Sequence, residues 1–158
     1  MRTKKEISPH DALVKAQNLC AKQEKCKADI RKKLYDWKIS SDDIENIINK
    51  LVTDKFIDEQ RYTEYFVRDK FRFNKWGRIK ITFALKQKQI PQDIINFAMQ
   101  QIDENTYRES LKNELLKKHK SIKDAETYKI KEKLLRFAQS RGYELEISLN
   151  EIEQLLSN

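Results

Sequence analysis

The sequence contains very few of the residues that form tight turns. Glycine and proline occur only twice each among 158 residues. A sandwich or barrel of many short strands needs such residues, because glycine allows a positive φ and proline presets the φ of a turn. Hydrophobic residues still make up 39% of the chain and charged residues 37%, which leaves enough apolar side chains for a core. The composition therefore favours an all-α protein whose helices are joined by short polar turns.

The sequence also lacks the residue clusters on which most catalytic sites depend. Gly77 and Gly142 lie far apart, so no glycine-rich loop can hold a nucleotide phosphate. The two histidines are isolated, and Cys20 and Cys26 have neither the number nor the spacing of a zinc site. Acidic residues such as Glu144 fall near predicted helix starts, where negative charge stabilises the helix dipole. We therefore expect no catalytic residue, no metal site and no cofactor, and we interpret the protein as a binding protein rather than an enzyme.

Long hydrophobic runs are missing as well. No stretch has the length of a membrane span, and the start of the sequence contains no apolar signal segment. Two cysteines are too few for a disulfide framework in a chain of this size. We therefore expect a protein that remains in the cytoplasm and makes no contact with a membrane. We also expect it to be a monomer.

Apolar residues recur at the spacing of amphipathic helices. One stripe follows the capping residues Ser40 and Ser41 and has positions i, i+3, i+4 and i+7. It comprises Ile44, Ile47, Ile48 and Leu51. A second stripe follows Pro91, which suits the first turn of a helix. It comprises Ile94, Ile95, Phe97, Ala98 and Ile102.

One pattern of three apolar positions occurs three times along the chain. The spacing is shared by Ile30, Leu34 and Ile39, by Ile81, Leu85 and Ile90, and by Leu134, Ala138 and Tyr143. A period of roughly 50 residues follows. We expect three tandem three-helix repeats that form an elongated or curved helical array, at residues 11–58, 59–103 and 104–158. Their helices are expected at about residues 12–23, 27–38, 41–53, 60–74, 77–88, 91–102, 105–118, 123–140 and 144–156.

The net charge of +8 conceals a strong alternation along the chain. Residues 12–38, 61–90 and 108–141 carry net charges of +5, +7 and +6. The segments that follow each of them, residues 39–60, 91–107 and 142–158, carry −4, −3 and −4. Charge is independent of apolar spacing, so the alternation supports the threefold repeat.

The most basic segment, residues 61–90, contains nine basic and only two acidic residues. Several of the basic residues share one helix face, and like charges on one face repel unless a partner supplies negative charge. We therefore predict a contact face for nucleic acid or an acidic protein, against the alternative of a solvated helix surface. Its candidate residues are Arg61, Arg68, Arg72, Lys75, Arg78, Lys80, Lys86 and Lys88. A secondary basic face, weaker because Glu126 and Glu132 lie close by, comprises Lys129, Lys133 and Arg136.

Aromatic residues are interleaved with the basic residues of this segment. Tyr62, Phe66 and Phe73 recur at helical spacing, which is typical of a buried stripe. We therefore expect them to pack in the core rather than to stack on nucleic-acid bases. Phe71 and Trp76 do not follow that stripe, and they are the candidates for exposed aromatic contacts.

Two groups of motifs resemble the RecX family of RecA regulatory proteins. The central group, in the family's order and with its gaps, is Phe56-Ile57-Asp58-Glu59-Gln60-Arg61-Tyr62, Gly77-Arg78-Ile79, Leu85 and Lys88-Gln89-Ile90. The later group is Lys133-Leu134-Leu135-Arg136-Phe137-Ala138 and Arg141-Gly142-Tyr143. The resemblance covers roughly residues 11–156 and implies tandem three-helix repeats. The family usually carries Lys-Gly where this chain has Trp37-Lys38 and Lys88-Gln89, which leaves the conformation of these two turns open.

The resemblance also implies a function. Members of the family are regulators that lie in the helical groove of a RecA filament on DNA and usually lower its ATP hydrolysis and strand exchange. This implies a part in homologous recombination, DNA repair and the SOS response, with no catalytic residue and with single- or double-stranded DNA met within the RecA complex. The alternative is a nucleic-acid-binding helical-repeat protein without a RecA partner, which would use the same positive faces.

Overall fold

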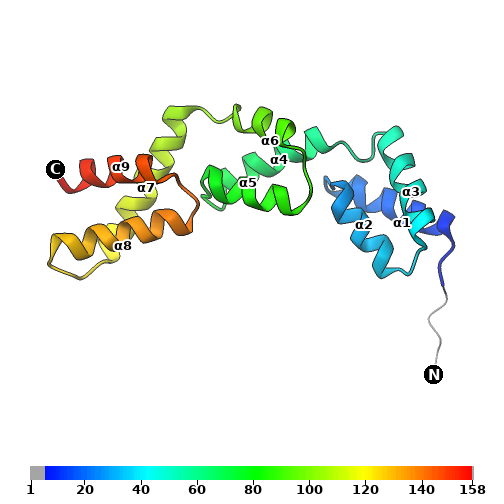
Figure 1. The fold of residues 1–158 in the computed structure, drawn as a ribbon, viewed down its shortest axis with the longest axis horizontal. Helices are drawn as coiled ribbons and strands as arrows, with labels where there is room; N and C mark the ends of the chain where they lie inside the picture. Colours follow the sequence, from blue (N-terminus) through cyan, green and yellow to red (C-terminus); the bar gives the residue numbers. More distant parts are fainter. Residues whose placement is uncertain (1–5, 158) are drawn as a thin grey trace, which may run out of the picture.

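The computed structural model describes residues 6–157, which form nine α-helices and no β-strand (Figure 1). The helices are α1 (Pro9–Lys22), α2 (Lys27–Asp36), α3 (Ser41–Thr53), α4 (Glu59–Arg72), α5 (Arg78–Gln87), α6 (Gln92–Met99), α7 (Glu104–Ser121), α8 (Thr127–Ser140) and α9 (Leu145–Ser157). They follow one another along an extended body, with α1–α3 at one end and α7–α9 at the other. The predicted all-α class and the array of three-helix repeats are confirmed.

Polar side chains determine where several of these helices begin. Four residues that directly precede a helix accept a hydrogen bond from the backbone N–H three residues later. They are Ser8, Ser40, Asp58 and Asp103. A cap of this kind stabilises a helix by about 1 kcal/mol. Three predicted bounds were wrong by three or four residues, because α6 ends at Met99, α7 ends at Ser121 and α8 begins at Thr127. Apolar spacing alone does not determine helix ends.

The buried side chains form two separate hydrophobic cores. The first lies among α1–α3 and includes Ile30 and Leu51. The second runs through α4–α9 and includes Leu85, Leu134 and Tyr143. The second and third repeats therefore share one core, whereas the first repeat has its own. Of the predicted ranges 11–58, 59–103 and 104–158, the second and third begin at the first residues of α4 and α7, whereas residue 11 lies within α1. The three ranges remain predictions.

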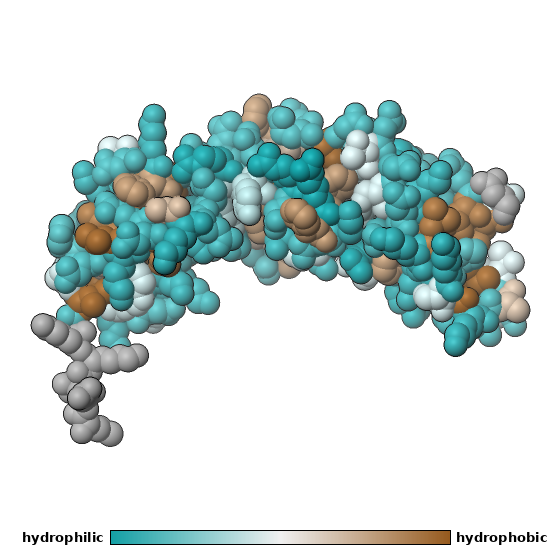
Figure 2. All heavy atoms as spheres, turned by 180° about the vertical axis from the view of Figure 1, so that it is seen from behind, coloured by the Kyte–Doolittle hydropathy of each residue, from teal (hydrophilic) through white to brown (hydrophobic). Residues whose placement is uncertain are grey.

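The three repeats form an open, curved body rather than a closed globule (Figures 1 and 2). Extensive helix–helix contacts occur within the repeats, so the repeats meet mainly at helix ends and turns. Figure 2 shows that the visible face is largely hydrophilic, with separate hydrophobic patches. A body of this shape exposes a large surface to partners.

The second helix of each repeat ends in the same turn. Lys38, Gln89 and Gly142 have φ values of 63°, 62° and 88°. In each turn the next residue donates its backbone N–H to the carbonyl oxygen five residues earlier: Ile39 to Leu34 (3.1 Å), Ile90 to Leu85 (3.2 Å) and Tyr143 to Ala138 (3.1 Å). This is the Schellman motif, whose left-handed residue is usually glycine. The two turns that depart from the family's Lys-Gly therefore still adopt the left-handed conformation.

Gln89→Gly is expected to raise the free energy of unfolding by about 0.5–1 kcal/mol. The left-handed conformation costs a non-glycine residue about 1–2 kcal/mol, part of which is offset by the greater entropy of glycine in the unfolded chain. The exposed side chain of Gln89 makes no hydrogen bond with residues 6–157 that the variant would lose. Urea unfolding measures the change. Gln87→Gly, at the last residue of α5, is the control and should instead lower stability, by less than about 1 kcal/mol. A Gln89→Gly protein no more stable than the parent contradicts the prediction.

Three predictions about aromatic side chains were wrong. Phe73 is 79% exposed because the buried face of α4 passes through Val67 and Phe71. Phe97 is 46% exposed because the buried face of α6 passes through Ile95 and Ala98. Phe71, a candidate for exposed contacts, is buried. In each case the buried face of the helix runs through other residues than the apolar spacing indicated.

Candidate functional site

The two glycines of the chain lie against each other where the second and third repeats meet. A Cβ atom on Gly77 would come within 2.4 Å of the carbonyl oxygen of Gly142, and one on Gly142 within 2.3 Å of the Cβ of Lys80. The N–H of Gly77 donates to the carbonyl of Arg141 (2.7 Å), and the N–H of Ile79 donates to that of Gly142 (3.0 Å). The backbones of the two repeats therefore dock directly, which fixes the start of α5 against the end of α8.

A charged network closes the same junction. The guanidinium of Arg78 hydrogen-bonds to Glu144 (2.7 Å) and to Glu104, and it lies 3.8 Å from the ring centroid of Tyr107. The hydroxyl of Tyr107 accepts a hydrogen bond from the backbone N–H of Arg78 (3.0 Å) and donates one to Glu144. Burial opposes the charge of Arg78, but the two carboxylates raise its pKa above the ordinary value. The charge of Arg78 is therefore compensated inside the protein.

The junction between the first and second repeats depends on side chains instead. The Nζ of Lys88 donates to Asp29 at 2.6 Å, and Arg61 pairs with Glu24. Burial disfavours the ionised form of Asp29, but Lys88 outweighs it and lowers the pKa of that carboxyl. Cys26 packs into the second core, and burial raises the pKa of its thiol to about 11. Among residues 6–157, no backbone–backbone hydrogen bond joins α1–α3 to α4–α6. The junction therefore relies on ion pairs, on a hydrogen bond from the backbone N–H of Lys27 to Glu59 (3.3 Å) and on the buried Cys26.

These contacts divide the predicted basic face into two groups. Three residues pair with carboxylates at the junctions, and they are Arg61, Arg78 and Lys88. The other five form no ion pair with any residue between 6 and 157, and they are Arg68, Arg72, Lys75, Lys80 and Lys86. Only the second group has positive charge that remains available to a partner.

Three cations of the second group lie together at the C-terminal end of α4. We call Arg68, Arg72 and Lys75 the α4 basic face. They line two adjoining hollows, one of about 420 Å³ between α4 and the start of α7 and one of about 770 Å³ farther along α7. Lys80 and Lys86 belong to α5 and line neither hollow. The opposite walls carry acidic residues, among them Asp103, Glu109 and Glu114, so the site presents both signs of charge.

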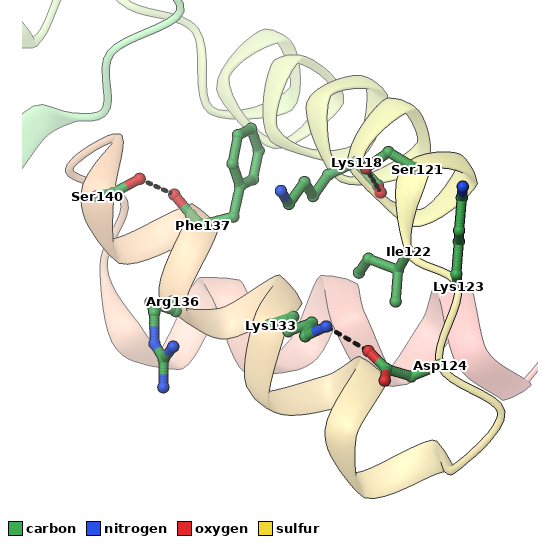
Figure 3. A pocket seen from close by; sticks show the side chains of 9 residues that line it. All are labelled: Lys118, Ser121, Ile122, Lys123, Asp124, Lys133, Arg136, Phe137 and Ser140. Atoms are coloured by element: carbon green, nitrogen blue, oxygen red, sulfur yellow. Dashed lines mark hydrogen bonds and ion pairs between the residues drawn. The ribbon is translucent and has the colours of Figure 1, made fainter.

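The secondary basic face lies on α8, and its charge is compensated. Lys129 pairs with Glu126 at 3.9 Å, Arg136 pairs with Glu132 at 2.9 Å, and Lys133 pairs with Asp124. Lys133 and Arg136 line a groove of about 710 Å³ between the end of α7 and α8 (Figure 3). The structure therefore places these predicted residues beside a groove but gives each of them a carboxylate partner.

Helix α5 carries an exposed apolar pair that the sequence reasoning missed. Ile79 and Phe83 are 56% and 63% exposed, whereas Ile81 and Leu85 on the other side of the same helix are buried. A helix with apolar residues on both sides can bury only one of them in its own core. An exposed apolar patch next to a charged surface is typical of a contact with another protein.

Family models match the second and third repeats. Residues 58–99 match the second three-helix domain of RecX, and residues 106–148 match the third. A regulatory protein RecX from Clostridium botulinum (strain Eklund 17B / Type B) is 30% identical over 159 residues, which cover 97% of this chain and 74% of that protein. The chain belongs to the RecX family. A further regulatory protein RecX, from Clostridium acetobutylicum, is 33% identical over 146 residues, covering 90% of this chain and 65% of that protein.

Two solved RecX structures have the same fold. A crystal structure of regulatory protein RecX gives a TM-score of 0.85 at 22% identity, covering 92% of this chain and 73% of that one. RecX from Lactobacillus salivarius gives a TM-score of 0.83 at 21% identity, covering 95% and 97%. These likenesses confirm the open RecX arrangement of three-helix repeats.

The residues that join the RecX repeats were not identified from the sequence. Glu144 was interpreted as a helix-start residue, yet it binds Arg78 and Tyr107 across the junction. Glu104 and Asp29 also pair with basic residues of a neighbouring repeat. All three stand at or near the start of a helix, where acidic residues are common because they stabilise the helix dipole. Their position in the sequence therefore did not indicate a contact with another repeat.

The described chain offers no obvious site for a metal ion. Residues 6–157 contain no group of three or more histidine, cysteine or acidic side chains that could hold one. Over the same range, no helix has the length and apolar character required to cross a membrane.

Proposed function

We propose that this RecX-family protein binds the RecA recombinase filament on DNA and inhibits its ATPase and strand-exchange activities, acting through contacts rather than catalysis. The proposal rests on the name that its relatives carry, regulatory protein RecX, and on the α4 basic face. Three cations without a carboxylate partner among residues 6–157 lie beside hollows that side chains of another protein can enter. An open array of repeats can reach neighbouring subunits of a filament.

The surroundings of the α4 basic face favour a protein as its partner. The hollows combine arginine and lysine with the acidic residues Asp103, Glu109 and Glu114, and a phosphate backbone would be repelled by that acidic wall. On α5, which lines neither hollow, the exposed pair Ile79 and Phe83 offers separate apolar area that nucleic-acid phosphates would not bury. We therefore assign the α4 basic face to RecA and not to DNA.

The DNA-dependent ATPase of the cognate RecA, measured with increasing amounts of this protein, tests the proposal. The rate is expected to fall at concentrations where free DNA is barely bound. A rate that does not change at any ratio contradicts the proposal. Inhibition that appears only where the protein coats the DNA would instead favour a nucleic-acid-binding protein without a RecA partner.

Arg68→Glu/Arg72→Glu/Lys75→Glu is expected to weaken this inhibition at least tenfold, which corresponds to about 1.4 kcal/mol. Reversed charges at an interface slow association and meet the partner's charge with the wrong sign. The control, Lys22→Glu/Lys32→Glu/Lys33→Glu, makes the same change in net charge on exposed lysines of the first repeat and should inhibit nearly as well as the parent. Equal inhibition by the first variant and the parent would show that the α4 basic face is not the contact.

A further inference from the structure

A second set of cations lies on the opposite side of α4 from the α4 basic face. Arg68 and Arg72 are four residues apart and therefore share one side of the helix, whereas Lys70 stands two residues from each and points the other way. Lys70 forms no ion pair with residues 6–157. Its charge lies instead among aromatic rings.

Trp76 is the centre of the first cluster on this side. The Nζ atoms of Lys70 and Lys80 lie 5.3 and 4.7 Å from its ring centroid. Lys70 also lies 5.5 Å from the ring of Phe66. Trp76 is half-buried and packs against the second core, so its ring is held in place with part of its surface open.

Phe137 is the centre of an equivalent cluster in the third repeat. Arg141 lies 5.1 Å and the Nζ of Lys118 lies 5.8 Å from its ring centroid. Figure 3 shows Lys118 pointing toward Phe137 across the groove between α7 and α8, with Arg136 turned away. Neither Arg141 nor Lys118 has a carboxylate partner among residues 6–157.

Side-chain hydrogen bonds join the two clusters across the junction of the two glycines. Lys80 donates from its Nζ to the carbonyl oxygen of Ser140 at 3.3 Å, and Arg141 donates to that of Asn74 at 3.2 Å. Each cluster thus reaches a residue of the other repeat, and together they form one continuous feature. We call it the cation–aromatic strip, and it comprises Lys70, Trp76, Lys80, Arg141, Phe137 and Lys118.

We propose that the cation–aromatic strip binds single-stranded nucleic acid, with phosphates on its four cations and bases against Trp76 and Phe137. The inference rests on the proposed function only for its setting, a RecA filament on DNA. An exposed cation–π contact contributes about 0.5–1 kcal/mol, whereas a base stacked on an aromatic ring contributes about 1–3 kcal/mol. A lysine can therefore leave the ring for a phosphate while a base takes its place.

The chemistry of the strip selects this partner over two others. Duplex DNA keeps its bases stacked inside the helix, so the two rings would gain nothing from it. An acidic peptide could pair with the cations but has no base for the rings. Only an unpaired strand offers regularly spaced negative charges together with flat rings.

Tryptophan fluorescence reports directly on the strip. The chain has two tryptophans, so Trp37→Phe leaves Trp76 as the single reporter and Trp76→Phe leaves Trp37 in the first repeat. Titration with an oligothymidylate, without RecA, is expected to quench Trp76 in a saturable way and to leave Trp37 unchanged. No quenching of Trp76 in a folded protein contradicts the proposal. Equal quenching by poly-glutamate would show a site for acidic protein and overturn it as well.

The salt dependence of affinity measures how many strip cations contact phosphates. Each such contact contributes about 0.7 to the slope of log affinity against log salt for single strands. Lys70→Gln/Lys80→Gln/Lys118→Gln is therefore expected to make that slope shallower by about 2 and to lower the affinity at least tenfold. Lys22→Gln/Lys32→Gln/Lys33→Gln, with the same loss of charge, should change both far less. Glutamine removes the charge but keeps a flexible polar side chain with two of the four methylenes of lysine, and circular dichroism verifies folding.

Two further outcomes separate this inference from the proposed function. If Arg68→Glu/Arg72→Glu/Lys75→Glu lowers oligothymidylate affinity as much as the strip variant does, the strand does not follow the strip and the inference is wrong. If the RecA ATPase never responds while Trp76 is still quenched, the proposed function fails and the strip stands.

Discussion

Gly77→Ala is expected to lower the free energy of unfolding of the second and third repeats by about 2–3 kcal/mol. The added Cβ would lie 2.4 Å from the carbonyl oxygen of Gly142 and 2.6 Å from the backbone nitrogen of Tyr143. These atoms are backbone, so the repeats must separate, and forced separation in a packed region costs about 1–3 kcal/mol. The same separation weakens the two backbone hydrogen bonds that join the repeats. For a unit of about 100 residues the melting temperature should fall by roughly 10–20 °C.

The two tryptophans make this prediction specific. Trp76 packs against the second core and Trp37 against the first, so urea unfolding followed through each one in turn reports on a different core. Gly77→Ala should shift the Trp76 transition and leave the Trp37 transition nearly in place. Gly142→Ala should lower the free energy of unfolding further, since Gly142 also has a φ of 88°. Gln139→Ala, an exposed change nearby, should cost under about 0.5 kcal/mol. Equal shifts of both tryptophans would show that the cores unfold together.

Arg78→Met is expected to destabilise the protein by about 2–3 kcal/mol. Its side chain is only 25% exposed, and its removal leaves Glu144, Glu104 and the ring of Tyr107 without their shared partner. Breaking a fully buried ion pair costs about 3–5 kcal/mol, and partial exposure of these groups reduces that figure. Thermal unfolding at neutral pH measures the loss.

Two variants check the cause of the Arg78 effect. Arg136 pairs with Glu132 at 2.9 Å, and both side chains are exposed, so Arg136→Met should cost no more than about 1 kcal/mol. Adding Glu144→Gln to Arg78→Met should recover part of the stability, because it removes a carboxylate that has lost its cation. If the double variant is no more stable than Arg78→Met, the effect comes from lost packing and not from an uncompensated charge.

Local patterns in the sequence were sufficient for the helices and for their threefold repetition. Capping residues such as Ser40 and Asp103 act within one turn, and the apolar spacing of Ile30, Leu34 and Ile39 acts within one helix and the turn that ends it. Both are short-range effects that can be recognised before any tertiary contact is known. The errors at Phe73 and Phe97 arose because the buried faces of α4 and α6 run through other residues than the apolar spacing indicated.

The candidate site was predictable only as a list of charges. Nine basic residues in one segment indicated a contact surface, but nothing in their spacing showed that Arg61, Arg78 and Lys88 each have a carboxylate partner in another repeat or connection. Those partners lie tens of residues away in the sequence. Charge counts therefore overestimated the basic surface available on α4 and α5.

The sequence by itself determined that this chain is all-helical, that it repeats three times and that it resembles RecX, because each property depends on order and spacing along the chain. Only the tertiary structure decided what its two glycines do. Apart in the sequence, Gly77 and Gly142 excluded a phosphate loop; in the folded chain they let two backbones meet and bring Trp76 and Phe137 onto one strip. That contact is possible because neither residue has a Cβ atom, and the spacing of glycines along the sequence does not show which of them meet in the fold.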